Sequence, residues 1–437
     1  MALTAFGPVS PAGAQSVDSL LDKLVDKGVL SVKEADQLRD ESDKDFDKAY
    51  AAKSGMADWV TALKFNGDLR GRYESFHYDN AAGVDRYRFR YRLRYGVTAA
   101  MTDNLEAGFR LGSGDLDSAG QITSGSDPIS NNQSFQNNGS KKGIFLDLVY
   151  GKWSPVRTED WQGSVTFGKM NNPFVFSDMV FDGDYTPEGG ALQITRNLVE
   201  GHSLNFNGAG FVLDEIGAQS EDPYLAGAQV RLESTWTPKF STSLGASILG
   251  VENEEYLRTA DVPNINVGNT RATTGANTNT LVYDYRPLIG DASMTYHLDE
   301  FWHYAAPFPI RVGGEYIYNP GAPTDNIGWT AGIYLGKSGK RGLWELSYRY
   351  KYLGADAWYE KLVDSDFGAF YETQPTGGVT GYGPGTNVKG HIVRAGYSPY
   401  NPLTIMLTAF FTELVNETPT ASESAATRIQ FDAILKF

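Results

Sequence analysis

The chain has 437 residues, among them 48 glycines, 25 tyrosines and 23 phenylalanines, and it has no cysteine. Its 53 acidic residues outnumber 38 basic ones, and this net charge of −15, without any basic block, argues against a nucleic-acid partner. The lack of cysteine excludes disulfides, thiolate metal sites and cysteine nucleophiles. No stretch approaches the ~18 consecutive apolar residues that a membrane-spanning helix needs. Many glycines and aromatics with few long apolar runs are typical of a β-barrel.

Residues 1–15 end in the small-residue triplet Ala12-Gly13-Ala14, which resembles the tail of a secretory leader with its cleavage site. A basic start and most of an apolar core are missing from this stretch, so a disordered N-terminus is the alternative. Under either interpretation, residues 1–15 are expected to lie outside the fold.

Residues 16–56 are predicted to form a short helical, coiled-coil-like segment before the barrel. An apolar stripe with helical spacing runs through Val17, Leu20, Leu21 and Leu24. A capping box at Ser31–Glu34 predicts a second helix, whose apolar stripe is too thin to stabilise it alone. Three roles are therefore open: association with copies of itself, contact with the cell wall through residues 16–55, or a solvated spacer.

After Leu63 the apolar period changes from 3.6 to 2, which predicts strands. In the clearest strand, five basic residues alternate with aromatic and aliphatic ones; they are Arg86, Arg88, Arg90, Arg92 and Arg94. Facing these arginines to lipid would cost about 2–4 kcal/mol for each one near the bilayer midplane. The pattern therefore favours a barrel with lipid outside and water inside.

Sixteen candidate strands follow one another along the chain. They cover residues 63–77, 86–101, 104–113, 143–154, 161–169, 191–197, 203–213, 224–237, 239–251, 281–297, 308–318, 327–337, 341–353, 387–397, 403–414 and 426–437. Short connections alternate with long ones, as expected for an outer-membrane barrel; the longest are 114–142, 170–190, 252–280 and 354–386. The predicted fold is all-β: a closed antiparallel transmembrane β-barrel of about 16 strands over residues 57–437. Fourteen or eighteen strands are the alternatives.

Several segments carry a resemblance to a known family. They are Val17–Glu41, Asn172-Pro173-Phe174, Asp182–Gly189 and the terminal Phe437. With them the sequence resembles a Gram-negative outer-membrane porin, more narrowly the "putative porin" family with a helical segment before the barrel. The resemblance implies a homotrimeric diffusion channel in the bacterial outer membrane, in contact with lipid and lipopolysaccharide, with the helical segment in the periplasm.

Charged side chains of the inward parity are expected to line the lumen. The strands carry sixteen such basic residues against ten acidic ones when 191–197 and 387–397, whose inward face is ambiguous, are left out. The main pore-lining candidates are Arg70, Arg72, Arg88, Arg90, Arg92, Arg94, Arg110 and Arg349. The resemblance further implies that loop 170–190 folds inward and narrows the pore. Its acids would face the arginines and set up a transverse field; they are Asp178, Asp182, Asp184 and Glu188.

These features predict passive diffusion of small hydrophilic solutes with a mild preference for anions. Two other functions stay open: a channel specific for sugars or phosphorylated solutes, and a structural barrel that tethers the outer membrane to the cell wall. The arginine row could also serve only to brace neighbouring strands.

No signal for chemistry accompanies the barrel pattern. The five histidines are scattered, and no serine–histidine arrangement can be nominated, so we expect no enzyme, no catalytic residue, no cofactor and no metal. The pairs Asp115/Asp117 and Asp364/Asp366 could hold calcium, but their spacing matches no known ion loop. Solvated loop acids are the preferred interpretation.

Overall fold

The computed structural model describes residues 56–115, 129–218, 220–258, 266–275, 278–373, 378, 380–417 and 423–437. The chain divides into two compact units, one of residues 1–63 with 99–102 and one of residues 64–98 with 103–437. The first unit is described only at 56–63 and 99–102, so the predicted leader and the helical segment 16–55 lie outside the described residues.

Sixteen strands of the described residues form a closed antiparallel barrel. They are β1 (Val60–Tyr78), β2 (Arg86–Met101), β3 (Leu105–Gly114), β5 (Gly143–Arg157), β6 (Trp161–Lys169), β7 (Glu188–Val199), β8 (His202–Val212), β9 (Tyr224–Thr237), β10 (Phe240–Glu252), β11 (Leu288–Leu298), β12 (Phe308–Tyr318), β13 (Ile327–Gly336), β14 (Trp344–Leu353), β17 (Val388–Tyr400), β18 (Leu403–Leu414) and β19 (Ala426–Lys436).

Three short strands belong to the connections. β4 (Gln133–Ser134) pairs with β2, whereas β15 (Gly368–Tyr371) and β16 (Gly381–Pro384) pair with each other. Three single 3₁₀ turns complete the described elements: η1 (Thr102–Asn104), η2 (Asn137–Gly139) and η3 (Glu254–Tyr256). No helix among the described residues is both long enough and apolar enough to cross a membrane.

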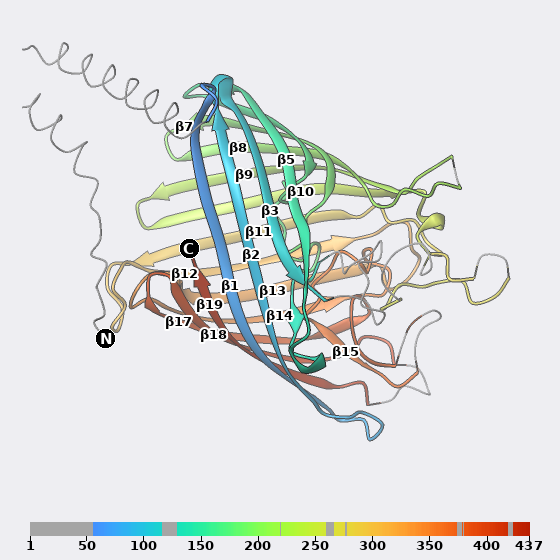
Figure 1. Ribbon diagram of the computed structural model, residues 1–437. Coiled ribbons are helices and arrows are strands. Elements are labelled where there is room, and N and C mark those ends of the chain that lie inside the picture. The colour runs from blue at the N-terminus through green and yellow to red at the C-terminus, as the bar shows by residue number, and fades with distance from the viewer. Residues whose placement is uncertain are drawn as a thin grey trace, which may run out of the picture. The chain divides into compact units, whose positions relative to one another are not determined.

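The first and last strands close the sheet. β1 pairs with β19 from Asp68↔Lys436 to Tyr78↔Ala426, and the other strands pair with their neighbours along the chain (Figure 1). The prediction of a closed antiparallel barrel with sixteen strands is thus confirmed. The largest difference from the predicted boundaries is at β11, which begins at Leu288 rather than 281; Leu281 and Tyr285 lie buried among the connections instead.

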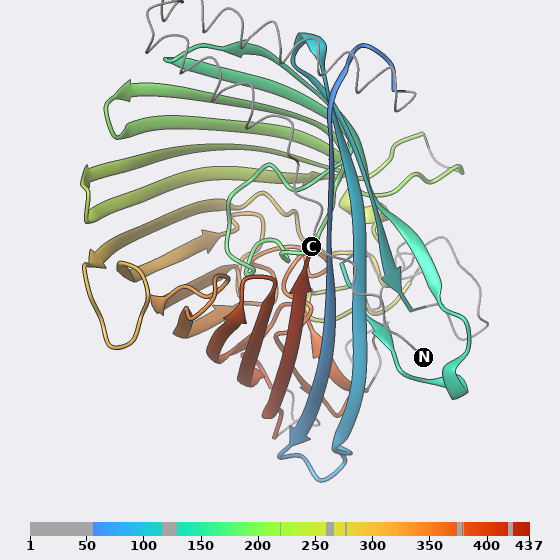
Figure 2. The same cartoon turned by 60° about the vertical axis from the view of Figure 1, so that its left-hand side comes forward.

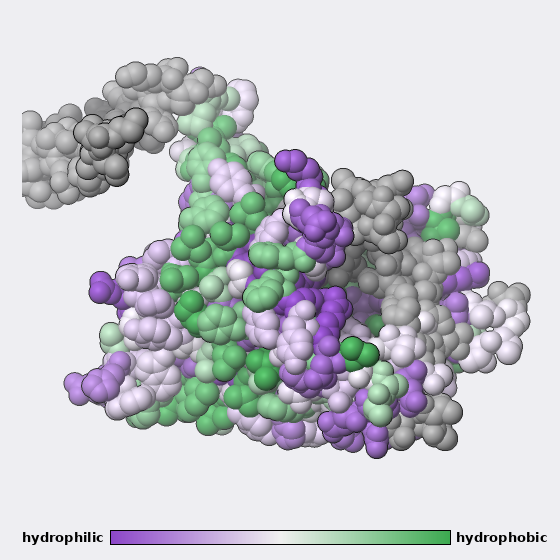
Figure 3. Space-filling view, turned by 60° about the horizontal axis from the view of Figure 1, so that its bottom comes forward, coloured by the Kyte–Doolittle hydropathy of each residue, from purple (hydrophilic) through white to green (hydrophobic). Residues whose placement is uncertain are grey.

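The two faces of each strand differ as the alternation predicts. On β2, Tyr87 and Phe89 are 59% and 58% exposed, whereas Arg92 is 6% exposed. Figure 3 shows hydrophobic residues gathered over the strands on the face that it presents. The exposed side chains of the barrel wall are largely apolar and aromatic. The charged side chains that alternate with them therefore point into the barrel.

Connections at one barrel end are short, and those at the other end are long. The connection between β6 and β7, residues 170–187, lies within the ring of strands (Figure 2). Parts of two further connections, β10–β11 and β14–β17, pack against it. The sequence analysis did not foresee that these two would turn inward.

A large apolar cluster, here called the loop core, forms where these three connections meet the wall. The wall contributes inward side chains near the long-connection ends of β8 to β14: Phe211, Leu225, Leu249, Val251, Ile289, Ile317 and Leu353. The connections contribute Met179, Val180, Phe181, Leu257, Leu281, Tyr285, Trp358, Tyr359, Leu362 and Val363. Apolar side chains facing a water-filled lumen would be unfavourable, so their burial draws the connections into the barrel.

Candidate functional site: an ion-paired passage inside the barrel

Residues 170–187 cross the barrel interior. The contacts with the wall, in chain order, join Val175 to Gln229 of β9, Ser177 to Glu315 of β12, Asp178 to Lys351 of β14, and Asp184 to Arg92 and Arg94 of β2. A segment that leaves β6 can reach β9, β12, β14 and β2 only through the lumen. The structure therefore places this loop inside the barrel, as predicted.

Local turns in 170–187 are set by the residues that carry the family resemblance. The backbone N–H of Phe174 donates to Asn172 Oδ1 at 3.0 Å, which forms a turn around Pro173. The N–H of Asp184 donates to Asp182 Oδ1 at 2.8 Å and the N–H of Tyr185 donates to the Asp182 carbonyl at 3.1 Å. Such side-chain turns of Asn and Asp are locally encoded, and the second one turns Asp184 toward β2.

A second inward segment, residues 354–367, completes the site. Lys351 Nζ lies 3.1 Å from an Asp364 carboxylate oxygen, and Asp366 binds Arg72 at 3.0 Å and Arg428 at 2.7 Å. Asp364 is 8% exposed. The interpretation of Asp364 and Asp366 as solvated loop acids is therefore wrong, because the segment folds back onto the basic wall.

Backbone hydrogen bonds join the two inward segments. The N–H of Asp364 donates to the Asp178 carbonyl at 3.0 Å, and the N–H of Ser365 donates to Asp182 Oδ2 at 2.9 Å. In the reverse direction, the N–H of Asp182 donates to the Leu362 carbonyl at 2.7 Å. The two segments therefore form one inward structure.

Most of the predicted basic residues are paired with carboxylates. Pairs between adjacent strands are Arg72–Asp432 (2.7 Å), Arg88–Glu74 (2.7 Å), Arg92–Asp68 (2.9 Å), Arg94–Asp68 (2.7 Å) and Arg110–Asp147. Arg349 instead binds Asp178 of the inward segment. Because such pairs are charge-assisted and several share partners, the row braces neighbouring strands and also holds the inward segments.

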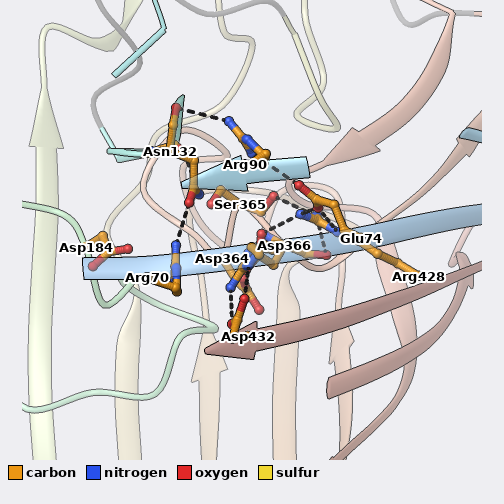
Figure 4. A network of polar contacts seen from close by, with 12 residues as sticks. Arg70, Glu74, Arg90, Asn132, Asp184, Asp364, Ser365, Asp366, Arg428 and Asp432 are labelled. Atoms are coloured by element: carbon orange, nitrogen blue, oxygen red, sulfur yellow. Dashed lines mark hydrogen bonds and ion pairs between the residues drawn. The ribbon is translucent and has the colours of Figure 1, made fainter. Parts of the chain in front are cut away.

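Arg70 and Arg90 both contact Asn132 (Figure 4). Arg70 Nη2 donates to Asn132 Oδ1 at 2.7 Å, and Arg90 Nη2 donates to the Asn132 carbonyl at 3.3 Å. Arg90 also lies 3.5 Å from Glu74. Asn132 was not singled out from the sequence, since nothing in a polar connection marks one amide as reaching two arginines.

The four predicted acidic residues do not all meet. Asp178, Asp182 and Asp184 lie in the inward segment, but Glu188 is the first residue of β7. Its exposed side chain pairs with Lys169 at 3.2 Å, on the adjacent strand β6. Glu188 therefore takes no part in the contacts with the arginine row.

Cavities lie on both sides of the segment Asp182-Gly183-Asp184. One, of about 460 Å³, is lined by the basic wall, including Arg70, Arg72 and Arg92. The other, of about 380 Å³, is lined by Arg94, Arg110 and aromatic residues of 170–187. Residues 182–184 line both cavities, so a solute moving from one cavity to the other would pass them.

The acids of the inward segments do not share one protonation behaviour. Burial, then the charges of Asp364 and Asp184, raises the pKa of Asp182 well above its usual range. Burial also opposes ionisation of Asp178, but Arg349 and Lys351 outweigh it and lower the pKa of that carboxyl. Burial is likewise outweighed at Asp366, where Arg428 and Arg72 hold the pKa well below the usual range.

Inward acids change the charge balance of the lumen. Five of them line the larger cavity: Asp178, Asp182, Asp184, Asp364 and Asp366. Glu345 and Asp432 of the strands line it as well, so seven acids face five arginines there. The passage is therefore strongly charged but close to neutral.

No group of three or more His, Cys, Asp or Glu in the described part of the chain is arranged to hold a metal ion. Asp115 accepts a hydrogen bond from the Ser134 N–H at 3.0 Å, whereas Asp117 lies outside the described residues.

Comparisons with known proteins agree with this architecture. The fold and the paired lumen define a β-barrel with inward-folded connections. The model of the "putative porin" family matches residues 81–283. No similar sequence is found among curated proteins.

Solved structures with a similar fold are bacterial outer-membrane proteins. OprB of Pseudomonas putida, in its high-pH structure, has a TM-score of 0.51 at 10% identity, covering 86% of this chain and 94% of OprB. OmpF of Salmonella typhi, in complex with daunomycin, has a TM-score of 0.47 at 11% identity, covering 86% of this chain and 97% of OmpF. The OprB likeness shows the fold.

Proposed function

We propose that the chain is a passive, water-filled diffusion channel of the bacterial outer membrane that passes small hydrophilic solutes and catalyses no reaction. The observation that carries the proposal is the pair of polar cavities, about 460 and 380 Å³, on either side of residues 182–184 inside a barrel with an apolar outer face. Charged side chains that line polar cavities inside a barrel are typical of a solute pathway.

Electrostatics of the passage support only weak ion selectivity. The arginines of the wall favour anions, and the acids of the two inward segments, with Glu345 and Asp432 of the strands, oppose this preference. Asp182 and Asp364 both have raised pKa values, so these two carboxylates are the first of the inward acids to lose their negative charge as the pH falls. A mild anion preference is the selectivity that we propose.

Three further features complete the proposal. The barrel assembles as a homotrimer in contact with lipid and lipopolysaccharide, and the helical segment 16–55 lies in the periplasm, where it could contact the cell wall. These features rest on the family match and the barrel fold. Chemical crosslinking in outer-membrane vesicles would test the trimer, and co-sedimentation of cell wall with a variant lacking residues 16–55 would test the contact.

Planar-bilayer recording of the purified protein tests the channel itself. We expect stepwise single-channel currents and, in a salt gradient, a reversal potential of small magnitude on the anion side. Absence of conductance from correctly folded protein would contradict the channel. Clear cation preference would contradict only the selectivity.

The strongest alternative is a channel specific for one class of solute. Stacked aromatic rings in 170–187 favour it, with centroids of Phe181 and Tyr185 5.7 Å apart beside the smaller cavity. Saturation of the current by a sugar at millimolar concentration would support this alternative over simple diffusion.

A further inference from the structure

One arginine in the larger cavity differs electrostatically from its neighbours. Five arginines line this cavity: Arg70, Arg72, Arg92, Arg349 and Arg394. Four of them contact carboxylates, namely those of Asp432, Asp68, Asp178 and Glu345. Arg70 makes an ion pair with no carboxylate of the described residues; its hydrogen bond goes to the neutral amide oxygen of Asn132, at 2.7 Å.

Arg70 is nevertheless buried. The residue is 8% exposed, and its Nε has no hydrogen-bond partner among the residues that the structure describes. Figure 4 shows the guanidinium directed at Asn132. A buried guanidinium whose charge is not neutralised by a contacting acid is unfavourable, so an anion in contact with it would be stabilised.

The surroundings of Arg70 suit a small oxyanion. A guanidinium presents a planar fork of donors that matches the two oxygens of a carboxylate or phosphate. Hydroxyl-bearing residues Ser347 and Thr408 line the same cavity. Asn132 is itself fixed, because its Nδ2 donates to Ser130 Oγ at 3.1 Å.

We propose that Arg70, supported by Asn132, forms a binding subsite for a small oxyanion, phosphate or carboxylate, in transit through the barrel. The inference rests on the proposed function and deepens it, since it names a class of solute that the passage holds. The acids Asp182 and Asp184 line the same cavity. Their repulsion keeps occupancy weak, which a conducting site requires because the solute must also leave.

Chloride conductance of the purified full-length chain tests the subsite in planar bilayers. Inorganic phosphate or acetate is added in separate arms at constant ionic strength. We expect a saturable decrease of the chloride current in at least one arm, and the arm with the lower half-saturating concentration identifies the preferred oxyanion.

Two matched variants locate the effect. Arg70→Gln removes the charge but keeps hydrogen-bonding capacity, and Arg157→Gln makes the same change at an exposed position at the end of β5. We expect Arg70→Gln to raise the half-saturating concentration about tenfold or more, as expected for loss of a charge-assisted contact, and Arg157→Gln to leave it unchanged. Circular dichroism and resistance to unfolding in detergent confirm that both variants fold.

Each outcome decides the proposal. Conductance without saturation by either oxyanion, or equal saturation in Arg70→Gln, overturns the subsite and leaves the channel standing. If the protein does not conduct, the proposed function fails, and calorimetric titration of the detergent-solubilised protein with phosphate and acetate still decides the subsite. Binding that Arg70→Gln weakens supports it, and absence of binding overturns it.

Discussion

The side chains that point into the barrel are charged on one side of the interior and apolar on the other. On β19, β1, β2 and β3, the ion-paired wall, inward positions carry arginines and carboxylates. At the long-connection ends of β8 to β14, the apolar wall, they carry residues such as Phe211, Leu225 and Ile317. Alternation alone therefore separates inside from outside, and the residue types on the inward face decide whether water or protein fills that space.

The difference explains how the passage is placed. Apolar inward side chains pack against the connections and form the loop core, while Asp178, Asp184 and Asp366 bind the edges of the inward segments to Arg349, Arg92 and Arg72. Apolar packing thus fills one side of the barrel interior with protein, and ion pairs hold the edges of the inward segments against the wall. The polar cavities remain beside the ion-paired wall.

Trp358→Ala should have the largest effect on this division. Trp358 is fully buried in the loop core, and its Nε1 donates to the Val180 carbonyl at 2.8 Å. Loss of the ring should destabilise the loop core by about 3–5 kcal/mol. We expect faster protease cleavage within 354–367 and larger, noisier single-channel currents. Trp302→Ala, at a 73% exposed position, is the control, and equal behaviour of the two variants would contradict the role of the loop core.

Asp184→Ala should have an intermediate effect on the opposite boundary. Asp184 binds Arg92 at 2.7 Å and Arg94 at 2.8 Å, and its loss should weaken anchoring by about 1–2 kcal/mol because the pairs are partly exposed. Two arginines lose one acidic partner, so reversal potentials should shift toward anions. Glu188→Ala, which removes only the exposed pair with Lys169, should leave them unchanged. A shift of equal size in both variants would argue against the special position of Asp184.

Acidification should produce the smallest change. Burial and the neighbouring charges of Asp364 and Asp184 raise the pKa of Asp182, so its protonated form is favoured in the folded protein. The resulting stabilisation of the junction between the inward segments is present below the ordinary carboxyl pKa and is lost as the pH rises through the raised value. Asp178 and Asp366, whose pKa values are lowered, keep their charges throughout this window.

Reversal potentials recorded from pH 7 to pH 4 check this behaviour. As Asp182 and Asp364 lose their charges, anion preference should rise slightly, because the acids that oppose it are partly neutralised. Asp182→Asn should start nearer the acidic value and respond less to pH. An identical pH response in the variant would assign the effect to other groups.

The strands were predictable because their signal is local. Parity along each strand and the alternation of connection lengths give all sixteen, and even β11 differs only at its start. The inward course of 170–187 came from the resemblance rather than from the residue pattern. Contacts between connections were not predictable in this way. Arg271 and Glu360, for example, form a fully buried ion pair at 2.7 Å between two connections, and no repeating sequence pattern indicates it.

The second inward segment did carry a signal. Trp358, Tyr359, Leu362 and Val363 lie close together in what reads as a solvent-exposed loop. Several large apolar residues in an outer connection indicate that it packs against something. Which wall they reach could not be read, because it depends on pairing between residues more than a hundred positions apart.

Cysteine accessibility tests most directly the claim that the water-filled path follows the ion-paired side of the barrel. The chain has no cysteine, so a single one introduced at Thr408 or Leu407 reports alone. Thr408 lies on β18 opposite Gln430 of β19, at the border of the ion-paired wall, and lines the larger cavity, whereas Leu407 is 47% exposed on the outer face. A charged methanethiosulfonate reagent should reduce the current of Thr408→Cys and leave that of Leu407→Cys unchanged. Unmodified current in Thr408→Cys, with conductance intact, would place the path elsewhere and contradict the account.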